Sequence, residues 1–371
     1  MKYPLKLANV SDIHLGHPET KTTSIIENLE KAFPNDSKTG ELDLILITGD
    51  VFDRLLTVPD DNVSAIKLWI YHFLKMCSKH NIVIRVLEGT PSHDWGQPKM
   101  FMEIKEISGL NVDLKYHNKL EVDYIESLDI NVLYIPDEWN PETDDTWVEA
   151  ETAVKKAKIG KVDFVAMHGC FHYQLPEFIN GPKHVESRYL SITNHFIFNG
   201  HVHRHSQYER ILVPGSFDRL CHGEEEEKGH LRVTVKAPDD SEIVFVPNHS
   251  ARKYVSVECH GLEPEKAIDK IRERLVDLPK YSSIRIVSNR NDPVIDSLKM
   301  LKDQYPHFTW CTKISTESQN VKDTLVDKRL TFKGVDITKD NIADLLLDRL
   351  KKDVDNKELL KHCKELLNQV I

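Results

Sequence analysis

Aspartate and histidine residues follow several short apolar segments of this chain, and their carboxylate and imidazole groups are ligands for divalent metal ions. Each segment has the length and composition of a buried strand. Because the carboxyl ends of parallel strands meet at one edge of a sheet, the sequence predicts a single site there. The segments and the residues that follow them are Lys6–Val10 with Asp12 and His14, Leu44–Thr48 with Gly49 and Asp50, Val162–Met167 with His168, and His195–Asn199 with His201 and His203.

This donor set indicates a centre of two metal ions. Oxygen and imidazole ligands suit Mn²⁺, Fe²⁺ or Zn²⁺, and the absence of cysteine from these positions favours Mn²⁺. Two ions about 3.5–4 Å apart need a bridging carboxylate. Asp50 is the expected bridge because it follows a glycine, where the backbone can approach the ions closely. One ion is expected to be completed by Asp12, His14 and His203, and the other by His168 and His201.

Two ions held in this way would bind a phosphate oxygen and a hydroxide, which could attack phosphorus near neutral pH. His93 follows a third predicted strand, Ile82–Leu87, and is placed to protonate the leaving alkoxide or to stabilise the transition state. Taken alone, each motif is weak, because an Asp-x-His triplet is usually incidental and His168 could be an ordinary buried histidine. Glu224–Glu227 are expected to form a solvated turn. The ordered set of motifs favours phosphoester hydrolysis.

Composition limits the other functional classes. The 371 residues are 29% charged and 40% hydrophobic, as expected for a soluble protein of two or three domains. No segment approaches the roughly 20 apolar residues of a membrane span, and no signal-like segment precedes the first strand. The 6 cysteines form no Cys-x-x-Cys pair, so we expect reduced thiols in a cytoplasmic protein, in the host cytoplasm if the source is viral. With a net charge of −10, binding to nucleic acid would need a local basic surface or the metals.

The pattern of elements changes along the chain. Residues 1–250 alternate predicted strands and helices and form the expected catalytic domain. Residues 251–310 are predicted to form a small β-α-β-α unit, and residues 311–338 are polar and weakly periodic, as in a linker. Residues 339–371 contain two amphipathic helical stripes.

One predicted helix, Asn62–Ser78, is apolar around much of its circumference. Such a helix is usually buried on two sides or lies at a subunit contact. Trp69 and Phe73 are therefore expected either at a two-fold contact or in the core of one subunit.

The strand-end motifs resemble the calcineurin-like metallophosphoesterase family, whose pattern is Asp-x-His, Gly-Asp, Gly-Asn-His-Asp/Glu, His and Gly-His-x-His. Within that family the chain is most similar to DNA-repair nucleases of the Mre11/SbcD type. The order and size of the smaller unit and the helical tail also match that type. The segments that carry the closer resemblance are Asp12–Gly16, Gly49–Asp53, Pro214–Ser216, Gly223-Glu224 and Lys228-Gly229.

The resemblance implies an α/β fold, a four-layer metallophosphoesterase β-sandwich flanked by helices, followed by a small α/β capping domain that binds DNA. It implies a DNA exonuclease, with or without endonuclease activity, that uses two divalent ions, preferably Mn²⁺ over Mg²⁺, Fe²⁺ or Zn²⁺. The implied partners are DNA, a second copy of the chain and a Rad50/SbcC-like ATPase that binds the tail at residues 339–371. No membrane partner is expected.

One departure from the family pattern concerns the second metal. Where the family has Gly-Asn-His, this chain has Gly89-Thr90-Pro91-Ser92-His93. The family's asparagine supplies a neutral oxygen ligand. Ser92 stands directly before His93, so the resemblance implies that its hydroxyl replaces the asparagine, directly or through a water.

Two other functions remain open from the sequence. The same core could serve a small-molecule phosphodiesterase or phosphatase, although the long region after the core has little use in such an enzyme. The chain could also be a non-catalytic subunit that tethers DNA ends. His93, His168 and His201 argue against that second alternative, because a subunit that has lost activity is not expected to retain them.

Overall fold

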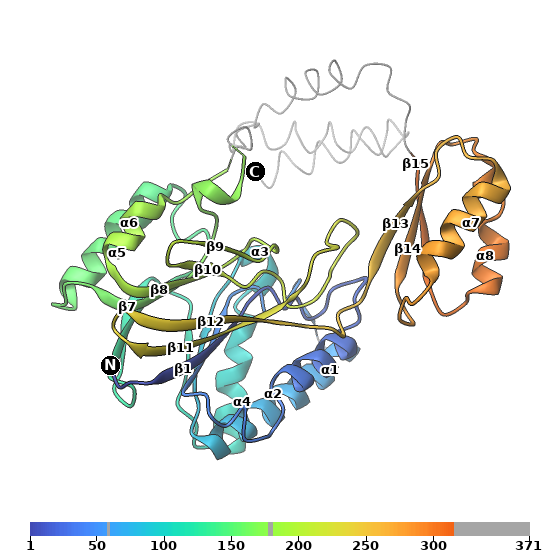
Figure 1. Ribbon diagram of the computed structural model, residues 1–371. Coiled ribbons are helices and arrows are strands. Elements are labelled where there is room, and N and C mark those ends of the chain that lie inside the picture. The colour runs from blue at the N-terminus through green and yellow to red at the C-terminus, as the bar shows by residue number, and fades with distance from the viewer. Residues whose placement is uncertain (58–59, 177–180, 315–371) are drawn as a thin grey trace, which may run out of the picture. The chain divides into compact units, whose positions relative to one another are not determined.

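The computed structural model describes residues 1–57, 60–176 and 181–314. Two six-stranded sheets make up most of it (Figure 1). The first sheet has the order β12-β11-β1-β2-β3-β4, formed by β1 (Leu5–Val10), β2 (Leu44–Thr48), β3 (Val83–Leu87), β4 (Leu114–His117), β11 (Gly229–Ala237) and β12 (Asp240–Pro247). The second has the order β5-β6-β7-β8-β10-β9, formed by β5 (Glu121–Ile125), β6 (Ile130–Ile135), β7 (Val162–His168), β8 (Thr193–Gly200), β9 (Ser206–Tyr208) and β10 (Ile211–Val213).

Helices cover the outer face of each sheet (Figure 1). The first sheet packs against α1 (Thr22–Ala32), α2 (Asp61–His80) and α4 (Met100–Ser108). The second packs against α5 (Thr143–Lys156) and α6 (Glu186–Ser191). The remaining short helices of this part are α3 (Pro91–Asp94), η1 (Gln97–Lys99) and η2 (His172–Gln174).

Strand β2 shows why the sheets stack in four layers. Leu44 and Leu46 belong to the apolar core between the two sheets, whereas Ile45 and Ile47 pack among the helices. Because both faces of this parallel strand are buried, its sequence is apolar throughout. The order of layers is helix, sheet, sheet, helix, which confirms the predicted α/β class and its four-layer sandwich.

Helix α2 is capped at both ends by residues that adjoin it in the sequence. Asp60 accepts a hydrogen bond from the backbone N–H of Asn62 at 2.9 Å, and Asn81 ends the helix in the left-handed conformation. The placement of Trp69 and Phe73 at a two-fold contact is wrong, because both are buried within the subunit and stack on each other with ring centroids 5.7 Å apart. The apolar side chains around α2 pack against α1 and α4.

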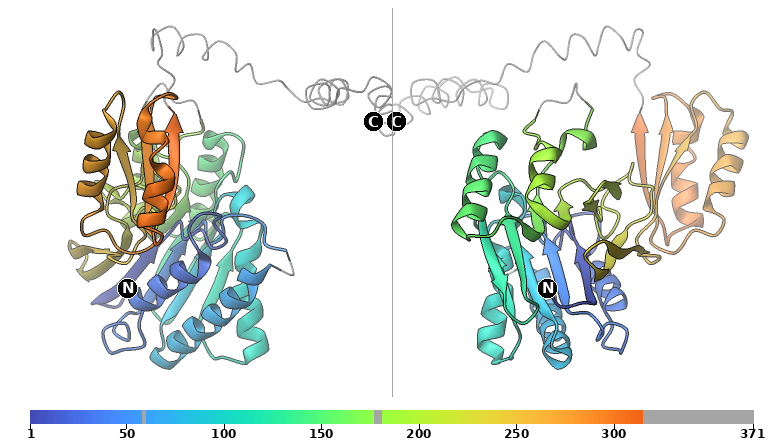
Figure 2. Two further views of the ribbon diagram at one scale, coloured as in Figure 1. Left: turned by 90° about the vertical axis from the view of Figure 1, so that its right-hand side faces the viewer. Right: turned by 60° about the vertical axis from the view of Figure 1, so that its left-hand side comes forward.

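A third sheet follows the two large ones. It consists of the parallel strands β13 (Tyr254–Glu258), β14 (Ser283–Ser288) and β15 (Thr309–Ile314), in that order. Its helices are α7 (Pro264–Leu275), η3 (Pro293–Ile295) and α8 (Leu298–Gln304), with α7 and α8 on one face of the sheet (Figure 2). Because β15 continues to Ile314, the first residues of the predicted linker form a strand. The rest of the linker and the tail lie outside the described residues.

Parallel pairing brings the site residues to one edge of each sheet. Strands β1, β2 and β3 are parallel neighbours, so the residues that follow them lie together. Strands β6, β7 and β8 are likewise parallel neighbours in the second sheet. The two edges are joined where the ring of His168, at the end of β7, donates from Nδ1 to the carbonyl oxygen of Thr48 in β2, at 2.7 Å.

Candidate metal centre

The backbone at the ends of β1, β2 and β8 turns sharply to present side chains. Asp12, His14, Asp50 and His201 have φ angles of 50°, 54°, 49° and 90°, in the left-handed region that non-glycine residues rarely adopt. Each such residue costs of order 1–3 kcal/mol and persists only when its surroundings enforce it. Here the loops enforce one another, because the N–H of His14 donates to the carbonyl of Asp50 at 3.1 Å and the N–H of His201 donates to the carboxylate of Asp12 at 3.1 Å.

Two glycines make room for the ring of His168. A Cβ on Gly49 would lie 2.2 Å from Nδ1 of His168, and a Cβ on Gly200 would lie 2.5 Å from the same atom. Gly49 also has a φ of 87°. The sequence predicts that Gly49 lets the backbone approach the ions. The structure shows that Gly49 also lets the ring of His168 come close to the backbone.

We call Asp12, His14 and His203 the first half-site. The Nε2 atoms of His14 and His203 face each other at 3.2 Å, and Nε2 of His203 is 3.8 Å from a carboxylate oxygen of Asp12. Asp12 and His14 are almost completely buried. Two imidazole nitrogens and a carboxylate that converge in this way are suited to share one cation.

Two carboxylates fix the outer nitrogens of these imidazoles. Nδ1 of His14 is 3.1 Å from Asp53, and Nδ1 of His203 is 2.8 Å from Glu224. With Nδ1–H donated outward, the lone pair of each Nε2 points into the half-site. Burial alone would raise the pKa of Glu224, but the hydrogen bond to His203 and the charge of Lys228 outweigh it and hold the pKa at about 2.

Sequence reasoning missed both of these carboxylates. Asp53 lies three positions after Asp50, and its only sequence signal was its place at the end of the resemblance segment Gly49–Asp53. Glu224 was expected in a solvated turn, but its side chain is only 13% exposed and its other oxygen lies 3.3 Å from Nζ of Lys228. The resemblance at Gly223-Glu224 was the one sequence signal that pointed to this position.

We call His168, His201 and Asp137 the second half-site. Nε2 of His168 lies 3.3 Å from a carboxylate oxygen of Asp50, and Nδ1 of His201 lies 3.2 Å from Oδ2 of Asp137. Nε2 of His168 is buried, and its partner in the structure is the Asp50 carboxylate, without a well-directed hydrogen bond between them. A buried ring nitrogen left in this state fits a metal ligand. Asp137 was not expected from the sequence.

Thr90 places a neutral hydroxyl oxygen at the second half-site. Its backbone N–H donates to Asp50 at 2.6 Å, and its hydroxyl donates to Asp137 at 3.0 Å and lies 3.5 Å from Nδ1 of His201. The assignment of Ser92 to this place is corrected, because Ser92 is exposed. Pro91 begins the short helix α3, and successive side chains of a helix point about 100° apart, so Ser92 turns outward before His93 turns back.

Asp50 lies between the two half-sites. Its Oδ2 is 3.3 Å from Nε2 of His168 and 3.8 Å from Nε2 of His14, so one carboxylate borders both halves. The same oxygen is 2.8 Å from Nδ1 of His93. The side chain of Asp50 is 3% exposed. This is the position that a bridging ligand would need.

His93 is the most exposed of the predicted site residues near Asp50, with a side chain 38% open to solvent. The hydrogen bond to Asp50 raises its pKa above the ordinary value, against the effect of burial. Asp94 holds the loop in place, because its carboxylate accepts from the N–H of Phe52 at 2.9 Å and of Gly89 at 2.7 Å. His93 also groups with His14 and Asp50 closely enough to offer a ligand atom.

The charges of the site's own groups are compatible with a bound cation. Burial alone would lower the pKa of His168, but the charge of Asp50 outweighs burial and raises the pKa to about 10. The hydrogen bond to Asp137 raises the pKa of His201 to about 11. Protons thus offset the buried carboxylates, and divalent metal ions would replace those protons. The structure brings together all the predicted site residues except Ser92.

Comparisons with known proteins give limited matches. No family model matches the chain. A DNA double-strand break repair protein Mre11 of Archaeoglobus fulgidus is 26% identical over 135 residues, which are 35% of this chain and 29% of the length of that relative. The crystal structure of a Thermus thermophilus protein, TT1561, aligns with 65% of this chain and 99% of its own, at 14% identity and a TM-score of 0.40. Another crystal structure aligns with 66% of this chain and all of its own, at 12% identity and a TM-score of 0.38.

Helices long and apolar enough to cross a membrane are absent from the described residues.

Proposed function

We propose that this protein is a metal-dependent phosphodiesterase that hydrolyses DNA at its ends, as an exonuclease with or without endonuclease activity. The observation that carries the proposal is the position of Asp50, whose carboxylate borders two clusters of Asp and His side chains and also holds His93. Two divalent ions, preferably Mn²⁺, would be held by these clusters. When bound, they would lower the pKa of a water molecule and stabilise charge on a phosphoryl oxygen.

His93 supplies the proton chemistry in this proposal. Nδ1 of its ring is held by Asp50, and its side chain is partly open to solvent, where a substrate can approach. The hydrogen bond to Asp50 raises the pKa of the ring and so favours its protonated form, which is the form that can donate a proton to the leaving alkoxide or bind the charged transition state.

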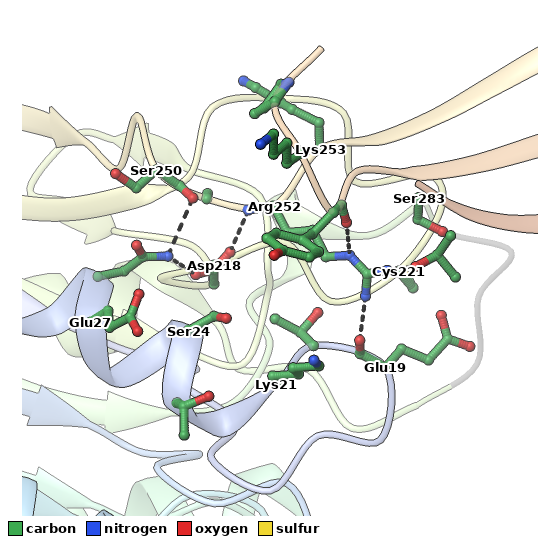
Figure 3. A pocket seen from close by; sticks show the side chains of 18 of the residues that line it. Glu19, Lys21, Ser24, Glu27, Asp218, Cys221, Ser250, Arg252, Lys253 and Ser283 are labelled. Carbon is green, nitrogen blue, oxygen red and sulfur yellow. Dashed lines mark hydrogen bonds between the residues drawn. The ribbon is translucent and has the colours of Figure 1, made fainter. Parts of the chain in front are cut away.

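DNA is proposed as the substrate partly because the similar Archaeoglobus fulgidus protein is named as a DNA double-strand break repair protein. A local basic surface gives a second reason. A cleft of about 960 Å³ lies between α1, the loop at 218–222 and the third sheet (Figure 3). Its lining has three acidic residues and six basic ones, and the basic ones are Lys21, Lys31, Arg252, Lys253, Lys280 and Arg285.

One of the three acidic lining residues, Asp218, is turned into the protein and is not part of the open surface of the cleft. Asp218 is buried and accepts from Asn28 at 2.6 Å and from the backbone N–H of Arg252 at 3.1 Å, as the dashed lines in Figure 3 show. The lysines at 21, 31 and 280 are exposed. In a protein with a net charge of −10, such a cleft is a suitable place for phosphate groups. This supports the DNA-binding role proposed for the capping domain at residues 251–310.

The central experiment is hydrolysis of a 3′-labelled DNA duplex with Mn²⁺ or Mg²⁺, with and without EDTA. We expect Mn²⁺-dependent release of label that EDTA abolishes. A parallel assay with bis(p-nitrophenyl) phosphate tests the small-molecule alternative. Cleavage of that ester with no cleavage of DNA would favour a small-molecule phosphodiesterase, and binding of DNA with no hydrolysis of either substrate would favour a tethering subunit.

The proposal also includes a homodimer and a Rad50/SbcC-like ATPase that binds residues 339–371, which lie outside the described part of the chain. Deleting residues 331–371 should abolish complex formation and ATP-stimulated cleavage and leave basal Mn²⁺-dependent hydrolysis nearly intact. Light scattering of the full chain tests the dimer, for which Trp69 and Phe73 give no support because they are core residues.

A further inference from the structure

We propose that Asp137 is a direct ligand of the second metal ion. The inference rests on the proposed function, which requires two ions. It gives the second half-site a negatively charged oxygen where the family pattern has a neutral asparagine. Thr90 would then position this carboxylate through its hydroxyl.

The topology explains how Asp137 reaches the site. Strand β6 ends at Ile135 and is the parallel neighbour of β7, which ends at His168. Asp137 therefore follows its strand at the same edge at which His168 ends the adjacent one. A ligand atom of each of Asp137, His168 and His201 lies within 4.8 Å of the other two.

The contacts of Thr90 show that several donor atoms gather at one point. Its hydroxyl oxygen is 3.0 Å from Oδ2 of Asp137, 3.3 Å from Oδ2 of Asp50 and 3.5 Å from Nδ1 of His201. Oδ2 of Asp137 is in turn 3.2 Å from Nδ1 of His201. Two carboxylate oxygens, a hydroxyl and an imidazole nitrogen thus surround a small volume, and Nε2 of His168 lies 3.3 Å from Oδ2 of Asp50.

Charge balance gives an independent argument. The side chain of Asp137 is 11% exposed, and its one ion pair among the described residues is with His201. If His201 binds a metal, its ring is neutral and that pairing is lost. A buried carboxylate without a compensating charge is strongly destabilising. A cation at the second half-site compensates this charge, most strongly when Asp137 binds it directly, whereas Glu224 at the first half-site has Lys228 beside it.

The alternative is that Asp137 only orients His201, as Glu224 orients His203. In that case Asp137 would accept a hydrogen bond from Nδ1–H and the metal would bind Nε2 of His201. An asparagine at position 137 could still accept that bond, so it would preserve most of the metal affinity. A direct ligand, in contrast, loses its charged oxygen in the same variant.

The first experiment counts metals by calorimetric titration of Mn²⁺ into the wild type and the variant Asp137→Asn. We expect two sites in the wild type. In the variant, affinity at one of them should fall by more than the about 10–100-fold that is typical of lost outer partners. Two sites with affinity reduced less than about 10-fold in the variant would overturn the inference. A wild type that binds no metal would instead refute the proposed function.

The second experiment asks whether residue 137 touches the ion. The variant Asp137→Cys, loaded with Co²⁺, should show a near-ultraviolet sulfur-to-metal charge-transfer band if position 137 ligates. Glu224→Cys is the matched control and should show none, because Glu224 contacts the outer nitrogen of His203. Cys170 lies close enough to His201 to affect the pKa of that ring, so the spectra are also taken with Cys170→Ser. Absence of the band at position 137 in both backgrounds would overturn the inference.

Discussion

The two half-sites use similar residues in different arrangements. In the first, His14 and His203 are backed by the carboxylates of Asp53 and Glu224, which lie outside the ring of donor atoms. In the second, His168 is backed by the backbone carbonyl of Thr48. The carboxylate of Asp137 lies inside, next to Nδ1 of His201.

This difference shows that the placement of a carboxylate matters as much as its presence. A carboxylate behind an imidazole makes that ring a better donor and fixes its orientation. A carboxylate inside the site changes the charge that the cation meets. Metal affinity at the first half-site should therefore fall when the carboxylates behind the imidazoles are replaced, and affinity at the second should fall when Asp137 is replaced.

The largest effect is expected from the residue that the halves share. Asp50→Ala should remove both metals and all hydrolysis, because the carboxylate borders the ring nitrogens of His14 and His168. Metal content by mass spectrometry and the duplex assay would measure this. A suitable control is Asp163→Ala, which removes a carboxylate that bonds the N–H of Asn131 in the second sheet. Hydrolysis that persists in Asp50→Ala would refute the shared bridge.

A smaller effect is expected from His93, which contacts the shared carboxylate of Asp50. His93→Asn should leave metal and DNA binding intact while the rate of hydrolysis falls by roughly 10²–10⁴-fold, as for a lost acid–base group. Single-turnover rates with parallel metal titrations separate the two effects. A fall in metal stoichiometry would make His93 a ligand, a role that its grouping with His14 and Asp50 allows.

Replacing the carboxylates behind His14 and His203 should weaken metal binding only at the first half-site. Asp53→Asn and Glu224→Gln should each weaken the first site by about 10–100-fold, because the Nε2 donors of His14 and His203 lose their backing. The second site should keep its affinity. Calorimetry with Mn²⁺ can resolve the two sites, and equal weakening of both would show that the halves are not independent.

The second half-site should also make metal binding depend on pH. The pKa values of His168 and His201 are raised to about 10 and about 11, so both rings carry protons at neutral pH until a metal displaces them. Apparent affinity should therefore rise between pH 6 and pH 8, by about tenfold per unit for each proton released. Titrations in buffers of different ionisation enthalpy measure the number of protons. Affinity that is constant over this range would contradict the expected proton release.

The core strands and most of the site were predictable from the sequence. Strands such as β2 are apolar on both faces, so their length and ends are visible in the residues. Aspartate and histidine at the ends of parallel strands must share an edge, and Asp12, Asp50 and His168 do lie together in the structure.

Other features gave weak or ambiguous local signals. Asp137 follows the end of β6 by two positions, as Asp12 follows the end of β1, but the acidic residues after it obscured that strand-end pattern. Strand β15 lies at the edge of its sheet and is mostly exposed, so it lacks the apolar signal of a strand. Trp69 and Phe73 gave an ambiguous signal, because an apolar helix face has the same composition against α4 as against a second subunit.

The smallest expected effect tests the correction at the second half-site. Ser92→Ala should change metal affinity by less than about threefold, because exposed substitutions of this kind usually stay within about 0.5 kcal/mol. Thr90→Val keeps the shape of the side chain and removes the hydroxyl that donates to Asp137 at 3.0 Å. Loss of one such bond is worth about 1 kcal/mol, so the second site should weaken by roughly fivefold. Calorimetry on the two variants side by side gives the answer, and weaker binding in Ser92→Ala than in Thr90→Val would restore Ser92 as the neutral ligand.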